Sequence, residues 1–310
     1  MQPNPILNKL GLSNNDRAVI IHTDDIGMCQ ASIQAFSDLY DFGLISSGSV
    51  MVPCPWFLKA AEFAREHRDA DLGVHLTLTC EWNSYRWGPV STRDPKSGMI
   101  DEEGCFYHQT APAVDHGDTI FVQVETEAQV ARAVRAGMQP THIDTHMGVS
   151  VSPKFMGGYL KVALENRLPA MIFRFSEDIL RHMGYDEVSA VAAAKLMQQL
   201  EDWGVPLLDQ ISFMPLDQSH DQIDFAKTAL DALQPGVTHF ILHPSVDTPE
   251  LRAIAPDWQS RVANYETFMS EEIRRHIHQS GIQVIGYRHL QQLMPDPSPI
   301  LEMLGSFNLS

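Results

Sequence analysis

Ala18-Val-Ile-Ile-His-Thr-Asp-Asp25 is an apolar, β-branched run that stops at two adjacent carboxylates. Three further segments share this form, with Asp or His within or at the end of an apolar run: Leu72-Gly-Val-His-Leu-Thr-Leu-Thr79, Thr141-His-Ile-Asp-Thr-His146 and His239-Phe-Ile-Leu-His-Pro244. In parallel α/β folds the functional side chains gather at the carboxyl ends of the strands. The four segments therefore predict one site, and their carboxylates and imidazoles are typical of a hydrolytic metal site.

Apolar β-rich runs alternate with helix-period stretches along the chain. Strands are expected near residues 18–24, 45–52, 72–79, 140–146, 170–175, 207–213, 238–243 and 282–287. Helices are expected near residues 30–41, 56–68, 126–136, 153–166, 187–203, 219–233 and 258–280. Eight strands with helices between them predict an α/β fold: a single-domain (β/α) barrel, TIM-like, with about seven to eight parallel strands over residues 1–310.

The composition and the lengths of the apolar runs bear on the partners, the location and the cysteine chemistry expected for the protein. With 39 acidic against 22 basic side chains, the formal net charge of −17 repels a phosphate backbone, so no nucleic-acid partner is expected. No apolar run approaches the length of a membrane span and the first residues lack a secretory core, so a cytoplasmic location is expected. The four cysteines have neither zinc-ribbon spacing nor a disulfide framework.

One connection breaks the alternation of strands and helices. No convincing helix is expected between Cys80 and Thr126, which predicts a long loop near residues 80–125 that overhangs the site. Its aromatic residues Trp82, Tyr85 and Trp87 offer flat apolar faces to a ligand. The alternative is that these rings only fasten the loop to the rim of the barrel.

The adjacent carboxylates Asp24 and Asp25 suggest two different roles in one site. Two like charges buried side by side are costly unless they share a cation or a proton. The strand is expected to end at Ile26-Gly27, where a turn brings both carboxylates to the mouth. One could then bind a metal while the other takes a proton from water. The alternative for Asp25 is to cap the following helix.

His142, Asp144 and His146 alternate along one strand and so lie on one face. Residues four apart on a strand are separated by roughly 13 Å, so the two histidines cannot bind one ion. His146 lies at the mouth and is the expected ligand, while His142 lies deeper in the core. Asp144 could orient an imidazole ligand without binding the ion itself. His75 is a further candidate ligand, with a hydrogen-bonded core position as its alternative.

His243 stands at the end of an apolar run, where Pro244 forces the chain out of the strand. A histidine at the rim can give a proton to a leaving group near neutral pH, which makes His243 the candidate acid. The alternative is a rim histidine without a function. His22 shares a strand face with Asp24 and is the next candidate.

These residues together resemble the YdjC-like carbohydrate deacetylases, which include the diacetylchitobiose deacetylases. The resemblance rests on short motifs that follow in order over nearly the whole chain. They are His22-Thr-Asp-Asp-Ile-Gly27, Gly73-Val-His-Leu-Thr-Leu-Thr79, His142-Ile-Asp-Thr-His146, His243-Pro244, Arg261-Val-Ala-Asn-Tyr-Glu266 and Ile285-Gly-Tyr-Arg-His-Leu290.

The resemblance implies a metal-dependent deacetylase on a barrel related to the polysaccharide deacetylase fold. It implies one divalent ion held by Asp25, His75 and His146, with Asp24 as general base and His243 as general acid. The substrate implied is a small carbohydrate with an N-acetyl group. Where the family often has further histidines after the position of His146, this chain has Met147-Gly148, and no role is carried over to them.

Two other interpretations stay open at this point. One is a metal-dependent hydrolase of another amide or ester on a similar barrel, although His22-Thr-Asp24 differs from the His-x-His of amidohydrolase-type barrels. The other is an inactive sugar-binding relative. The presence of both Asp24 and His243 argues against it, because binding alone needs neither an acid nor a base. One carboxylate and two imidazoles suit zinc, whereas added waters suit magnesium, manganese or cobalt. Whether the chain forms a homo-oligomer is open.

Overall fold

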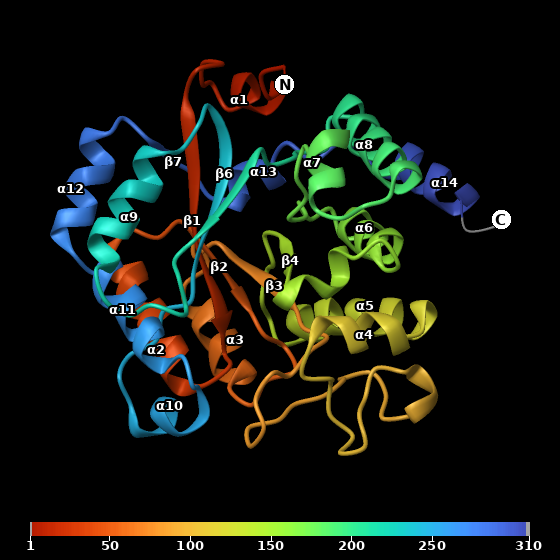
Figure 1. Cartoon of the computed structure of the whole chain (residues 1–310), viewed down its shortest axis with the longest axis horizontal. Helices are drawn as coiled ribbons and strands as arrows, with labels where there is room; N and C mark the ends of the chain where they lie inside the picture. The colour runs from red at the N-terminus through yellow and green to blue at the C-terminus, as the bar shows by residue number, and fades with distance from the viewer. Residues whose placement is uncertain (1, 308–310) are drawn as a thin grey trace.

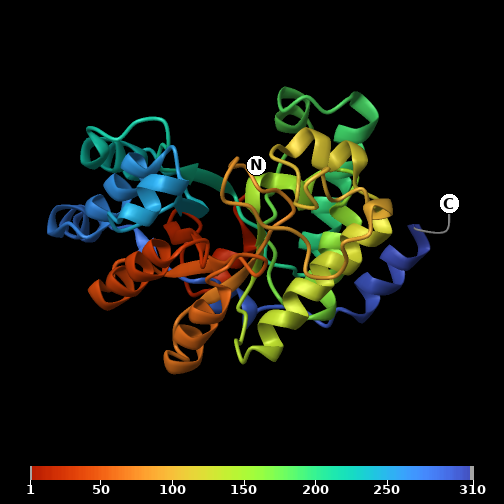
Figure 2. The same cartoon turned by 90° about the horizontal axis from the view of Figure 1, so that it is seen from below.

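The computed structural model describes residues 2–307, and within them one sheet of parallel strands curls into a half-barrel with helices around its outside (Figures 1 and 2). The strands are β1 (Arg17–Ile26), β2 (Ser47–Val50), β3 (Leu72–Leu76), β4 (Ile143–Thr145), β5 (Gln210–Phe213), β6 (Gly236–Leu242) and β7 (Gln283–Val284). Their order is β4-β3-β2-β1-β6-β5, and β7 pairs with β1.

The helices of the described residues follow in chain order. They are α1 (Pro5–Lys9), α2 (Gln30–Phe42), α3 (Phe57–Glu66), α4 (Thr110–His116), α5 (Thr119–Arg135), α6 (Met156–Glu165), α7 (Glu177–His182), α8 (Glu187–Asp202), α9 (Gln222–Asp231), α10 (Pro249–Ile254), α11 (Trp258–Phe268), α12 (Glu271–Gln279), α13 (Tyr287–Gln291) and α14 (Ser298–Phe307). Two 3-10 turns are η1 (Pro95–Ser97) and η2 (His146–Val151). None of these helices has the length and apolar character needed to cross a membrane.

The expected closed barrel is wrong, because the sheet stays open between β4 and β5. The segment expected as a strand at residues 170–175 makes only two single bridges, Ala170 with Ile143 and Phe173 with Leu208. The chain bends directly after Phe173, where the Phe175 amide donates to the Phe173 carbonyl. A bend at this point prevents a continuous ladder. The single domain was expected over residues 1–310, of which residues 1 and 308–310 lie outside the described part.

β1 is the central strand, and the side chains on its two faces have different neighbours. It pairs with β6 along most of its length, while its other edge is shared by β7 at the start and β2 at the end. Val19 and Ile21 pack in an apolar cluster with α9 and α12, outside the sheet. Ala18 and Ile20 lie in the interior cluster that also contains residues of α1 and α13. The next residue on this interior face is His22, so the polar side chains of the site follow directly after the apolar ones along β1.

The connection expected to be irregular near residues 80–125 is only partly so. Its first part, up to Gln109, has no α-helix and contains η1. Its second part holds α4 and the start of α5, whose N-terminus is capped by the Asp118 carboxylate. The helix expected near 258–280 is divided between α11 and α12, because Ser270 provides a new N-cap.

Candidate active site

A β-bulge brings Asp24 and Asp25 to the same place. Thr23 pairs with Gly48 on β2 and Ile26 pairs with Val50, so the two aspartates stand opposite the single residue Ser49. The bulge carries Asp25 at φ 62, a left-handed conformation that turns its side chain toward the interior mouth. The strand therefore continues through Ile26, and it is the bulge rather than an early turn that gathers both carboxylates. Asp25 does not cap α2, whose N-cap is Cys29.

Asp25, His75 and His146 form what we call the upper trio. Asp25 Oδ1 lies 3.5 Å from His75 Nε2 and 3.2 Å from His146 Nδ1, and one atom from each residue lies within 4.8 Å of the others. All three side chains are buried. Among the described residues, Asp25 Oδ1 and His75 Nε2 have no hydrogen-bond partner. Unpartnered buried atoms of one carboxylate and one imidazole, with a second imidazole beside them, fit a divalent cation.

Each imidazole of the upper trio has a carboxylate behind it. His75 Nδ1 donates to Asp144 Oδ1 at 2.8 Å, and His146 Nε2 donates to Glu81 Oε2 at 3.0 Å. A proton on the nitrogen that faces the carboxylate leaves the other nitrogen free to bind a metal. The orienting role of Asp144 was expected from the sequence, whereas that of Glu81 was not. The signal available was its position two residues beyond the apolar run that carries His75.

Arg261 on α11 was also missed as a site residue. Its Nη1 lies 2.7 Å from Asp25 Oδ2 and its Nε donates to Asp257, so the guanidinium holds the second oxygen of Asp25. Burial raises the pKa of Asp25, but the positive charge of Arg261 and the contacts with His146 and His75 together outweigh it, and that pKa lies well below the usual range. Asp25 is thereby kept ionised with Oδ1 turned to the two imidazoles. The segment that begins at Arg261 was part of the resemblance, without a role attached to it.

Asp24 and His243 flank the upper trio. Asp24 Oδ2 lies 3.7 Å from His243 Nε2 and 3.9 Å from His75 Nε2. The His243 backbone amide donates to the Asn264 side chain on α11, which fixes the residue as the chain leaves β6. Burial lowers the pKa of the His243 imidazole from its ordinary value. A carboxylate and an imidazole, neither committed to the trio, therefore stand beside it.

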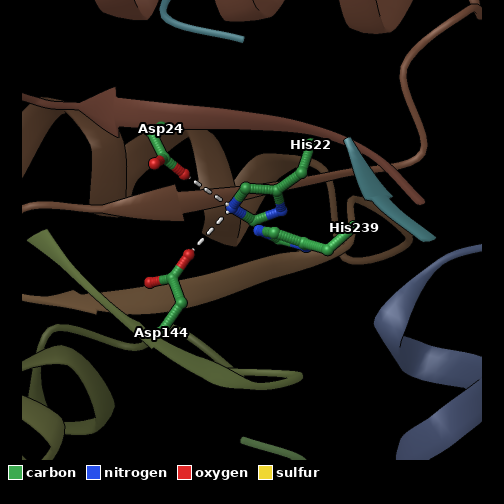
Figure 3. A group of neighbouring side chains, drawn as sticks. All are labelled: His22, Asp24, Asp144 and His239. Carbon is green, nitrogen blue, oxygen red and sulfur yellow. Dashed lines mark ion pairs between the residues drawn. The ribbon is translucent and has the colours of Figure 1, made fainter. Parts of the chain in front are cut away.

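A second group lies deeper in the half-barrel and is called the lower cluster: His22, Asp24, Asp144 and His239 (Figure 3). His22 Nε2 lies 3.1 Å from Asp24 Oδ1 and 2.9 Å from Asp144 Oδ2. His142 is close by but belongs to neither group, because its ring stacks on Tyr287 with centroids 3.9 Å apart. His142 therefore lies outside both groups, whereas His146 belongs to the upper trio.

Comparison with known proteins places this site in a family. The sequence profile described as YdjC-like protein matches residues 18–279. The chain belongs to the YdjC-like family. The resemblance stated from the motifs is thereby confirmed.

Two relatives of this YdjC-like chain share one name, and a solved structure carries another. A carbohydrate deacetylase of Thermus thermophilus is 31% identical over 270 residues, which cover 87% of this chain and 92% of the relative. A carbohydrate deacetylase of Enterococcus faecalis is 25% identical over 284 residues, with 89% and 99% covered. A solved structure of a candidate cellobiose-phosphate cleavage protein from E. faecalis V583 superposes with a TM-score of 0.73 at 25% identity, covering 89% of this chain and 99% of that one.

The aromatic residues of the long connection are mostly packed away in this YdjC-like chain. Trp82 and Trp87 are 7% and 4% exposed, and their rings meet edge to face. The Trp87 indole donates to the Thr79 carbonyl and the Tyr85 hydroxyl donates to the Met28 carbonyl. This packing favours the rim-fastening alternative over stacking on a ligand.

A cavity of about 890 Å³ lies away from this site, among α6, α7 and α8, with a mostly apolar wall. None of the candidate metal, acid or base residues lines it. The candidate active site is therefore identified by its converging buried polar atoms and not by this cavity.

Proposed function

We propose that this chain is a metal-dependent hydrolase that removes acetyl groups from N-acetylated sugars or oligosaccharides. The observation that carries the proposal is the upper trio, where Asp25 Oδ1 and His75 Nε2 are buried without a hydrogen-bond partner among the described residues. Asp24 and His243 beside it supply the two groups that amide hydrolysis needs in addition. The relatives named carbohydrate deacetylase support an acetylated sugar as the substrate.

The atoms expected to hold one divalent ion are Asp25 Oδ1, His75 Nε2 and His146 Nδ1. Asp144 and Glu81 orient the two imidazoles for that task, and Arg261 occupies the other oxygen of Asp25. When bound, such an ion supplies Lewis-acid activation of water and stabilisation of negative charge on the carbonyl oxygen. One carboxylate and two imidazoles suit zinc, and added waters extend the choice to magnesium, manganese or cobalt.

Asp24 is the proposed general base. Its Oδ1 is held by His22, whereas its Oδ2 faces the space between His75 and His243. Burial raises the pKa of Asp24, but positive charge at His75, carried by a proton or, when His75 is a ligand, by the ion, and the contact with His22 lower it by more, so the carboxylate is ionised. An ionised oxygen that faces the reacting space can accept a proton from the attacking water.

His243 is the proposed general acid. An amine is a poor leaving group until its nitrogen is protonated, so amide cleavage needs a donor on the leaving side. His243 Nδ1 is buried without a hydrogen-bond partner among the described residues, whereas Nε2 lies 3.7 Å from Asp24 Oδ2, and the side chain is 19% exposed. The imidazole can therefore present Nε2 to an incoming substrate.

Measurement of acetate release tests the proposal. Purified protein, stripped with a chelator and reloaded with zinc, magnesium, manganese or cobalt, is incubated with a panel of N-acetylated mono- and disaccharides. Acetate release that depends on an added metal supports the proposal. Hydrolysis restricted to aryl esters or other amides would indicate a different hydrolase. Sugar binding by calorimetry without turnover under any metal would indicate an inactive binding relative.

A further inference from the structure

In the lower cluster, one imidazole nitrogen faces two carboxylates. His22 Nε2 lies 2.9 Å from Asp144 Oδ2 and 3.1 Å from Asp24 Oδ1, and the two carboxylates reach it from different strands, β4 and β1 (Figure 3). His22 is fully buried, and Asp24 and Asp144 are 8% and 1% exposed. Two carboxylates this close, and this far from water, repel each other unless positive charge lies between them.

The other groups around His22 do not supply that charge. His239 from β6 and His142 pack against the His22 ring, and burial lowers the pKa of both, that of His239 to about 3. Tyr287 and Ser49 also face it but are neutral side chains. His75 contacts Asp144, but as a metal ligand it must be neutral. Among the described residues, His22 is then the one group in contact with both carboxylates that can carry a proton for them once His75 is a metal ligand.

We propose that His22 is a positioning residue: its imidazolium bridges Asp24 and Asp144 and so joins the general base to the carboxylate that orients the ligand His75. This inference rests on the proposed function, because it assigns Asp24 as the base and His75 as a ligand. The bridge runs from Asp24 through His22 to Asp144 and on to His75 Nδ1.

The bridge has two consequences for the reaction. It holds Asp24 Oδ1, so that Oδ2 is the oxygen left to face the reacting space. It also compensates the second buried negative charge, so that Asp24 and Asp144 can both stay ionised in the same low-dielectric interior. Burial lowers the pKa of His22, but the hydrogen bonds and charges of Asp144 and Asp24 overcome this and raise it to about 9, which agrees with the bridge.

A second cation in place of the proton is the competing explanation, because His22, Asp24, Asp144 and His239 have atoms within 4.8 Å of one another. In that case Asp24 Oδ1 would be a ligand, and the carboxylate would be a weaker base. Separations of 2.9 and 3.1 Å suit a single N–H shared between two carboxylates. On the other side, Asp24 Oδ1 and Asp144 Oδ2 are buried without an aligned hydrogen-bond partner among the described residues, and Ser49 Oγ lies 3.1 Å from the same nitrogen. The number of ions per chain decides between the two.

The direct test is ¹⁵N NMR of histidine-labelled, metal-loaded protein at neutral pH, with the His22 signals assigned by their loss in His22→Gln. Protons on both ring nitrogens of His22 are expected, together with one divalent ion per chain by elemental analysis. A neutral His22 ring overturns the proposal. Two ions per chain, with one of them lost in His22→Gln, overturn it as well. These results do not depend on whether the protein deacetylates a sugar, so they are separate from the test of the proposed function.

Kinetics of matched variants test the positioning role. His22→Leu should lower kcat roughly 10- to 100-fold, as loss of an orienting partner does, while KM stays within about threefold and one ion stays bound. His22→Gln replaces Nε2 with an amide donor and should recover part of the lost kcat. His239→Gln is the control, since it alters the same buried cluster without touching either carboxylate bridge. If His239→Gln matches His22→Leu, or His22→Gln recovers nothing, the effect is general packing and the proposal fails.

Discussion

The upper trio and the lower cluster are built from the same two residue types within one half-barrel, yet their surroundings differ. In the upper trio, carboxylates on the far side of each ring hold a proton there and leave the inner nitrogen free. In the lower cluster, both carboxylates face the same nitrogen of one ring. The first arrangement favours a metal ion and the second favours a shared proton. If both proposals hold, the placement of neighbouring carboxylates decides whether a His/Asp group binds a metal ion or a proton.

The largest expected effect separates the two groups directly. His146→Ala should remove the divalent ion and reduce deacetylation to the level of chelator-stripped protein, because only two protein ligands remain. His239→Ala, the matched change in the lower cluster, should keep one ion per chain. Elemental analysis and acetate release are measured on both. Stoichiometric metal in His146→Ala would show that the ligand set is wrong.

Asp24 belongs to the lower cluster but faces the upper trio, so its replacement tests whether it acts as a base or as a metal ligand. Asp24→Asn should keep the ion and the fold but lose turnover by about 10²-fold or more, as removal of a general base does. Asp25→Asn should instead lose the ion. Metal content, circular dichroism and kcat are compared. Loss of the ion in Asp24→Asn but not in Asp25→Asn would exchange the two roles.

His243 lies at the rim, outside both groups, and its effect should depend on the leaving group. His243→Ala should slow amide substrates by about 10²-fold but activated aryl esters only slightly, because phenolate leaves without a proton. In the unaltered protein, burial lowers the pKa of His243, so the protonated acid is lost as pH rises through a value below the usual 6.5. The falling limb of kcat/KM should lie there and vanish in His243→Ala. Equal losses on both substrates would indicate a positioning role instead.

The sequence predicted the upper trio better than its surroundings, and the reason is physical. Asp25, His75 and His146 lie at or near the carboxyl ends of β1, β3 and β4, and parallel strands bring such ends together whatever the helices do. Glu81 and Arg261 lie on a loop and on a helix, where no periodicity relates them to the strands. The half-barrel was mistaken for a closed barrel because an apolar run at residues 170–175 reads as a strand, although the bend after Phe173 prevents a ladder.

Glu81 tests whether the carboxylates behind the rings matter for metal binding. Glu81→Leu should weaken metal affinity by roughly 10- to 100-fold, because His146 loses the acceptor that fixes its proton on Nε2. Glu81→Gln keeps an acceptor oxygen and should lose less. Affinity is measured by competition with a chelating dye. If the leucine and glutamine variants bind metal as tightly as the unaltered protein, the contact has no orienting role.

The smallest effect on catalysis is expected at the aromatic residues above the upper trio. Trp87 is 4% exposed and donates to the Thr79 carbonyl, so Trp87→Ala should destabilise the fold, by about 3–5 kcal/mol as for other buried aromatic truncations. KM and kcat should change by no more than about threefold at temperatures where the variant is folded. Trp87→Phe keeps an aromatic ring, although a smaller one, and loses the indole donor, so its melting temperature should lie between those of the unaltered protein and Trp87→Ala. A large rise in KM with an unchanged melting temperature would instead mean that the ring stacks on the sugar, and that the loop binds substrate rather than only covering the rim.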